Sequence, residues 1–420
     1  MTTTLERRVP TGAGQRSLPP VPRVPAAGLA LAGLGWAAVA TGHAPDAFSV
    51  LRVAAAVAAV GAAGYGLTRR VRVAGWSALA AGTLALTVGI GIGSRWLQKA
   101  PATLPAIGGA AGLLGSLVLL SWAGVVLLRA ARGWHAVAAL PVGIAVVLTV
   151  LTTFPALVAT NVPPTGLGSR TPASYGLAFT DVTFRTSDGV RLSAWWVAGT
   201  NGAAVVVRHG SGSTRSSTLD QSAVLARHGY GVLLVDARGH GRSGGTGMDW
   251  GWYGDLDTSA AVTYVTEVGR ATRVGVLGLS MGGEEAIGAA ASDRRIRAVV
   301  AEGATGRNAA DRDVVLPRGV NGRVQRVLDV AMFGLADLLT GASVPPSLRD
   351  AARRASVPTL LVAAGEVADE ATAAEAVRAA SPSTVGVWVV PGASHTRGLA
   401  AEPAAWEARV VAFLDAALTS

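Results

Sequence analysis

The chain has 420 residues, and its hydrophobic fraction of 50% and mean hydropathy of +0.42 are too high for a purely soluble protein. It contains no cysteine, which excludes disulfides, thiolate metal sites and a cysteine nucleophile. The net charge is +10, but residues 1–160 hold twelve Arg or Lys and only two acids, which leaves 24 basic and 24 acidic residues in 161–420. Because the basic excess lies wholly in the apolar part of the chain, we expect no nucleic-acid partner.

The first 160 residues are predicted to form a tail and a membrane domain. Residues 1–25 are polar and rich in Arg and Pro, which predicts a disordered tail. Residues 26–160 contain apolar runs, each near the roughly 20 residues that cross a bilayer. Five membrane-spanning helices are therefore predicted, at 26–43, 47–67, 73–93, 106–128 and 136–158. The first run is the weakest, and its loss would move the C-terminal domain to the other side of the membrane.

The flanking charges predict the orientation of these helices. With five spans, nine basic residues share the side of the N-terminus, namely Arg7, Arg8, Arg16, Arg23, Arg69, Arg70, Arg72, Arg129 and Arg132. The opposite side has Arg52, Arg95 and Lys99. The positive-inside rule then predicts a cytoplasmic N-terminus and a C-terminal domain outside the cytoplasm. No carboxylate lies within any span, so we interpret the bundle as an anchor rather than a transport route.

After a linker at 161–175, residues 176–420 alternate short β-branched runs with amphipathic helices. This alternation predicts an α/β fold with a mostly parallel sheet covered by helices. The expected strands are 181–186, 190–198, 203–208, 231–236, 273–279, 296–301, 359–364 and 384–390, and the expected helices are 215–228, 255–268, 281–291, 370–380 and 402–418. Residues 304–355 interrupt the alternation after the sixth strand and are predicted to form a lid above the sheet.

Two stretches match the G-x-S-x-G pattern that surrounds many nucleophilic serines. In a chain with 54 Gly the pattern alone means little, so its context decides. Ser280, in Gly278-Leu-Ser-Met-Gly282, follows the strand 273–279 and opens a helix, which is the tight turn that exposes a nucleophile. Ser243 runs into Gly-Gly-Thr-Gly with no helix and is interpreted as a loop serine. We therefore expect Ser280 to be the nucleophile.

A serine nucleophile needs a base to take its proton and a carboxylate to orient that base, in the chain order Ser, acid, His. His395, in the loop after the last strand, is the only histidine downstream of Ser280. The acid should follow the strand 359–364. Asp369 is the first choice and Glu366 the alternative, whereas Glu370 is interpreted as starting the next helix, where an acid suits the helix dipole.

The reaction also needs backbone N–H donors for the oxyanion that develops on the attacked carbonyl. One should come from the residue after the nucleophile, Met281, and the other from Ser211 in the loop after the third strand. Gly210 lets that loop approach the substrate.

Four motifs together resemble the α/β-hydrolase superfamily: Arg208-His-Gly210, Asp236-Ala-Arg-Gly-His-Gly-Arg-Ser243, Gly278-Leu-Ser-Met-Gly-Gly283 and Pro391-Gly-Ala-Ser-His395. The resemblance covers about 176–420. It implies a Ser-acid-His triad that uses no metal and no organic cofactor. The usual family spacing would place the acid one residue before Asp369, which keeps Glu366 open.

The expectation is a membrane-anchored serine hydrolase that cleaves an ester, thioester or amide of a small or lipid-like acyl substrate. A peptidase or acyltransferase of the same fold is an alternative, because the resemblance implies no substrate. A catalytically idle binding module tethered to the membrane is another.

Overall fold

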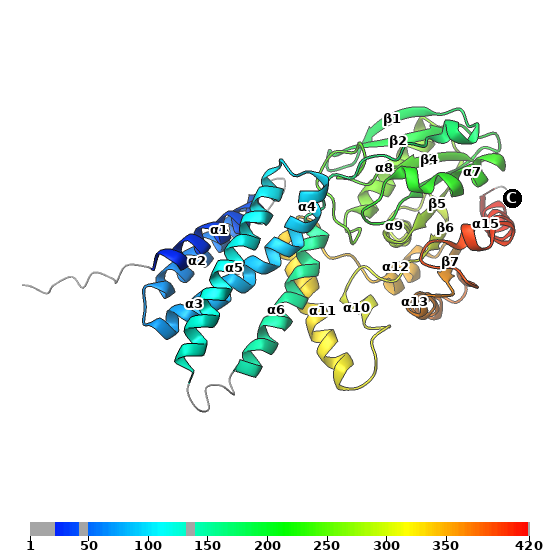
Figure 1. The fold of residues 1–420 in the computed structure, drawn as a ribbon. Helices are drawn as coiled ribbons and strands as arrows, with labels where there is room; N and C mark the ends of the chain where they lie inside the picture. The colour runs from blue at the N-terminus through cyan, green and yellow to red at the C-terminus, as the bar shows by residue number, and fades with distance from the viewer. Residues whose placement is uncertain (1–21, 42–48, 132–138, 419–420) are drawn as a thin grey trace, which may run out of the picture.

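The computed structural model describes residues 22–41, 49–131 and 139–418 (Figure 1). The predicted tail lies outside these residues up to residue 21, and the first helix begins at Arg23. An all-helical bundle leads into a unit built on one sheet, and Figure 1 shows the two side by side. We treat the boundary between them as the stretch from Asn161 to the short 3-10 helix η3 (Pro172–Tyr175).

The bundle contains five helices that are long and apolar enough to cross a membrane. They are α1 (Arg23–Thr41), α2 (Ser49–Leu67), α3 (Val71–Val88) continued by η1 (Gly89–Gly93) and α4 (Ser94–Lys99), α5 (Leu104–Ala130) and α6 (Ala139–Thr160). Glycines allow close packing between them: a Cβ on Gly89 would lie 2.6 Å from the backbone N of Leu113 on α5. Small residues at such crossings let backbones approach in lipid.

The C-terminal unit is an eight-stranded sheet in the order β1-β2-β4-β3-β5-β6-β7-β8. β2 pairs antiparallel with β1 and β4, and the other pairs are parallel. The strands are β1 (Thr180–Arg185), β2 (Arg191–Val197), β3 (Ala203–Arg208), β4 (Gly231–Val235), β5 (Arg273–Leu279), β6 (Ile296–Glu302), β7 (Thr359–Ala364) and β8 (Val385–Val390). The predicted fold class is confirmed.

Helices cover both faces of the sheet, because the parallel strands are apolar on both sides. One face packs on α7 (Leu219–Arg227), which follows the short η4 (Arg215–Thr218), and on α15 (Pro403–Leu418). The other face packs on α8 (Gly254–Glu267), α9 (Met281–Ala290), α12 (Leu348–Ala355) and α13 (Ala368–Ala380). The central strand β3 is buried along its whole length, and its carboxyl end leads to the site.

The insertion after β6 contains α10 (Ala309–Arg312) and α11 (Val320–Leu339) before α12. Figure 1 shows α11 running beside α6 of the bundle, and Phe333 and Ala336 of α11 share a buried apolar cluster with Ala156 and Ala159 of α6. α11 therefore bridges the two parts of the chain. That this insertion acts as a lid stays a prediction.

Polar contacts also join the bundle to the sheet unit. Arg95 on α4 forms an ion pair of 2.8 Å with Asp249, and the Lys99 ammonium donates to Thr165 Oγ1 at 2.9 Å. The indole N–H of Trp96 donates to the Asn161 carbonyl at 3.0 Å. The end of the third candidate span is thus fixed against the sheet unit.

Candidate active site

Ser280 lies on a strained turn between β5 and α9. Its φ of 53° and ψ of −121° are unusual for a residue with a side chain, and they raise its hydroxyl above the carboxyl ends of the strands. The turn needs glycines around it: a Cβ on Gly278 would lie 2.0 Å from the Gly282 carbonyl oxygen, and one on Gly282 would lie 2.5 Å from that of Arg208. The sequence therefore folds here into the nucleophile elbow that the motif predicts.

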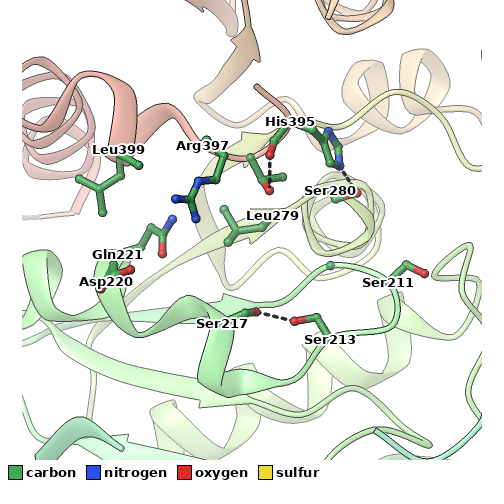
Figure 2. A pocket seen from close by; sticks show the side chains of 13 residues that line it. Ser211, Ser213, Ser217, Asp220, Gln221, Leu279, Ser280, His395, Arg397 and Leu399 are labelled. Carbon is green, nitrogen blue, oxygen red and sulfur yellow. Dashed lines mark hydrogen bonds between the residues drawn. The ribbon is translucent and has the colours of Figure 1, made fainter. Parts of the chain in front are cut away.

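His395 connects Ser280 to a buried carboxylate. Its Nε2 lies 2.9 Å from Ser280 Oγ, and its Nδ1 lies 2.6 Å from Glu370 Oε1 (Figure 2 shows the serine and histidine). The second oxygen of Glu370 accepts the backbone N–H of Ala364 at 2.7 Å, which holds the carboxylate at the end of β7. Ser280, His395 and Glu370 are thus connected in the order that acyl transfer requires.

The structure corrects the predicted acid. Asp369 and Glu366 are both exposed, whereas Glu370 is 1% exposed. Because α13 begins at Ala368, Asp369 in its first turn points to solvent and the next residue faces back toward the sheet. The extra methylene of Glu lets the carboxylate reach His395 from the helix. The sequence predicts that this helix starts at residue 370, whereas it starts two residues earlier, at Ala368. The earlier start turns Glu370, rather than Asp369, toward His395.

The hydrogen bond with Glu370 is the largest influence on His395 and raises the pKa of its imidazole above 6.5, although partial burial opposes this. Two further carboxylates, Glu284 and Glu302, act in the same direction. Glu284 is itself buried beside the site, and burial raises its pKa to about 7 even though it accepts N–H groups from Gly306 and Thr305.

The loop after β3 brings its backbone close to the nucleophile. A Cβ on Gly210 would lie 3.2 Å from Ser280 Cβ, and Ser211 lines the same cavities as Ser280. As the first residue of α9, Met281 has an N–H with no carbonyl partner within the helix. Both predicted oxyanion donors are therefore near Ser280.

A buried ion pair beneath the elbow was not found from the sequence. Arg208, the last residue of β3, donates from Nε to Glu285 Oε2 on α9 at 2.8 Å, and its guanidinium forms ion pairs with Glu285 at 2.6 Å and with Asp257 at 3.7 Å. All three side chains are buried. Removing one partner of such a pair typically costs about 3–5 kcal/mol, so the pair fixes α9 and the loop of Ser211 relative to each other. The sequence gives no signal for this ion pair, because Arg208 and Glu285 lie 77 residues apart and meet only in the folded structure.

Ser243, the serine of the second G-x-S-x-G match, has a structural role: it links β2 to the residue after β4 through hydrogen bonds. Its hydroxyl donates to the Asp236 carbonyl at 2.7 Å and accepts the Ser193 N–H at 2.9 Å. Within the described residues, no group of three or more His, Asp or Glu side chains is arranged to hold a metal ion.

Sequence and structure comparisons agree with this architecture. A family model described as serine aminopeptidase, S33, matches residues 199–337. The chain is 30% identical over 133 residues to a thiohydrolase, aneE, of Aspergillus aculeatus, which covers 29% of this chain and 40% of that protein. It is 29% identical over 198 residues to a polyketide transferase, grgF, of a Penicillium species, covering 44% of this chain and 62% of that protein. The chain thus spans less than two thirds of the length of either relative.

Among solved structures, the esterase Pf2001 of Pyrococcus furiosus aligns with a TM-score of 0.49 at 25% identity, covering 61% of this chain and 99% of the esterase. The sheet order, the elbow at Ser280 and the family match together define the class: the C-terminal unit has the α/β-hydrolase fold. In the described residues this unit follows five helices that are apolar enough to cross a membrane.

Proposed function

We propose that this protein is a membrane-anchored serine hydrolase that cleaves a carboxylic ester, thioester or amide through an acyl-enzyme. The observation that carries the proposal is the chain of contacts from Ser280 Oγ through the His395 ring to the buried Glu370. A hydroxyl is a weak nucleophile until a base removes its proton, and this geometry supplies both the base and its orienting carboxylate.

The reaction proceeds in two halves. His395 Nε2 takes the Ser280 proton as Oγ bonds to the substrate carbonyl carbon, and the N–H groups of Met281 and Ser211 hold the resulting oxyanion. His395 then gives its proton to the leaving atom, and the bond to that atom breaks. Water attacks the acyl-enzyme while His395 accepts its proton, and the acid is released as Ser280 regains a proton. Glu370 stabilises the imidazolium in both halves.

The same proposal places the five spans in a membrane with the N-terminus in the cytoplasm and the hydrolase unit outside it. The number of apolar helices and the nine-to-three distribution of basic residues support this orientation.

Ser280→Ala tests the chemistry in the full chain purified in detergent. We expect it to abolish both turnover of p-nitrophenyl butyrate and labelling by a fluorophosphonate, because both reactions start at Oγ. Ser243→Ala is the matched control, since it alters the other G-x-S-x-G serine, and it should still label. A labelled Ser280→Ala protein would contradict the assignment, and a wild-type protein that no serine probe labels would favour the binding-module alternative.

The peptidase and acyltransferase alternatives share this acyl-enzyme and are separated by the second substrate. An ester hydrolase releases the free acid in water alone. A transferase would release it slowly and accelerate when an acceptor alcohol or amine is supplied, and a peptidase would turn over an aminoacyl p-nitroanilide in preference to an ester.

A further inference from the structure

Ser280 lies where two cavities meet. The first, of about 550 Å³, is lined by polar side chains such as Ser213, Ser217 and Gln221, together with His395 (Figure 2). The second, of about 570 Å³, also contains Ser280 and Ser211 but extends in another direction, past Met281 toward the helical bundle. A substrate carbonyl at Ser280 can therefore extend one half into each cavity.

The walls of the second cavity come from the membrane bundle and the insertion helix. Leu151, Phe154 and Val158 of α6 line it on one side, and Leu328 and Met332 of α11 line it on the other. Its lining also includes charged side chains, namely those of Asp249, Glu284, Arg312 and Asp329. Phe333 closes this region by packing on Trp250, with ring centroids 4.5 Å apart. A helix that could cross the membrane thus forms a wall of the space next to the nucleophile.

α11 places both polar and apolar side chains toward the protein and a row of valines toward its surroundings. Asp329 is 2% exposed and accepts a hydrogen bond of 2.8 Å from Gln325, and both residues line the second cavity. The opposite face carries Val320, Val324, Val327 and Val330, whose exposed fractions lie between 47% and 68%. Arg323 and Arg326 are exposed in the same turns. An exposed row of valines with arginines beside it is the pattern expected of a helix at a membrane surface, where the arginines reach the headgroups.

The exposed face of α6 continues the same surface. Leu140, Ile144, Val147 and Leu151 are all more than half exposed and follow one side of that helix at spacings of three and four residues. Leu151 lies at both the outer surface of α6 and the wall of the second cavity, because it is 55% exposed and also lines that cavity. The cavity therefore reaches the apolar outer surface at the contact between α6 and α11.

The proton transfers determine which half of the substrate enters which cavity. His395 must protonate the leaving atom, so the leaving group lies on its side of Ser280, in the polar cavity that it lines. The acyl group then lies on the side of Met281, in the second cavity.

We propose that the substrate is a membrane lipid ester whose acyl chain enters directly from the bilayer, between α6 and α11, while its polar leaving group occupies the cavity around Ser213, Ser217 and Gln221. This inference rests on the proposed hydrolase function and adds to it the substrate class and the direction of entry. α11 forms one side of the entrance, with its valine face in contact with lipid.

Substitutions at neighbouring positions of α11 test the acyl cavity. Leu328→Trp fills it, whereas Val327→Trp adds the same ring to the lipid-facing side. In the full chain reconstituted in phosphatidylcholine nanodiscs, we expect Leu328→Trp to lower the preference for p-nitrophenyl dodecanoate over butanoate by at least about tenfold, because several methylenes lose their pocket. Val327→Trp should keep that preference within about twofold, as exposed substitutions usually do. Equal effects of the two variants would overturn the proposal.

A photoreactive probe tests the same idea on the wild-type protein, so that it does not depend on a variant folding. The probe is a fluorophosphonate whose long alkyl chain carries a diazirine: Ser280 Oγ bonds to phosphorus, fluoride leaves, and light inserts the tail into a neighbouring C–H bond. We expect crosslinked peptides from α6 and α11. Crosslinks to the region of Gln221 and Leu399 instead would reject the lipid route while leaving the hydrolase intact, and absence of any labelled Ser280 would reject the hydrolase itself.

Discussion

Glu370 provides the carboxylate of the site from inside a helix, and the consequence is a histidine that protonates easily. The residue is buried, its two oxygens are bound by Ala364 and His395, and its hydrogen bond, followed by its charge, raises the pKa of the His395 imidazole. Catalysis needs the neutral imidazole as a base, so activity should be lost as the pH falls through this raised pKa.

Substitution of Glu370 should show this coupling. With Glu370→Gln we expect the acid limb of the kcat/KM profile to move to lower pH, because the largest influence that raises the pKa of His395 is gone. The rate at pH 8 should fall by about 10³–10⁴-fold, since an amide favours the wrong tautomer of the ring and cannot stabilise its cation. The measurement is ester hydrolysis from pH 5 to 9 in the same detergent.

Asp369→Asn is the matched control for that experiment, because it removes the neighbouring carboxylate in the same helical turn. The side chain of Asp369 is exposed to solvent, so its loss should leave the rate and the pH profile within about twofold of the wild type. If Asp369→Asn gave the larger defect, the assignment of Glu370 would be wrong.

At the scale of elements, periodicity predicts most of what the structure contains. All eight strands lie within one or two residues of their expected positions, because β-branched runs bounded by Gly, Pro and Asn have few other ways to fold. The five apolar runs likewise become five helices of spanning length. These features depend on local sequence, which is why they can be read from it.

Two features could not be predicted because they depend on tertiary placement. The first is the carboxylate that contacts His395, which was predicted one residue too early. The start of α13 at Ala368 decides whether Asp369 or Glu370 faces the sheet. The packing of α11 on α6 is the second feature. Its apolar stripe is compatible with either a buried core or lipid, and only the packing of Phe333 and Ala336 on α6 distinguishes the two.

The close crossing of the third span and α5 gives a prediction at this scale. A side chain at Gly89 would collide with the backbone of Leu113, which cannot move aside without separating the helices. We expect Gly89→Val to destabilise the bundle by roughly 1–3 kcal/mol, the usual cost of overpacking. The thermal unfolding midpoint of the detergent-solubilised chain should fall accordingly.

Gly124→Val on α5 provides the comparison, because a Cβ there meets nothing within 4 Å. It carries the same change in helix propensity without the collision, so the midpoint should stay close to that of the wild type. Similar losses in both variants would mean that propensity, and not the crossing, causes the effect.

At the scale of the whole molecule, the proposed orientation in the membrane decides on which side of it the C-terminal unit lies. The chain lacks cysteine, so a single introduced thiol is a unique reporter. Ser187→Cys, exposed before β2 in the hydrolase unit, should react with a membrane-impermeant maleimide in intact cells. Thr68→Cys, between α2 and α3, should react only after the cells are permeabilised. The reverse pattern would place the hydrolase in the cytoplasm and imply that one of the five helices does not span.

The position of Ser280 between a polar cavity and one that opens beside α6 also bears on the fate of the products. With the lipid ester proposed above as substrate, a fatty acid released into the second cavity would return to the bilayer, whereas a polar alcohol would leave into water. The two products are then separated into different phases at the moment of cleavage, which opposes resynthesis of the ester. The rate would accordingly follow the mole fraction of substrate in the membrane rather than its bulk concentration, and diluting the substrate with inert phospholipid would slow the enzyme at constant total substrate.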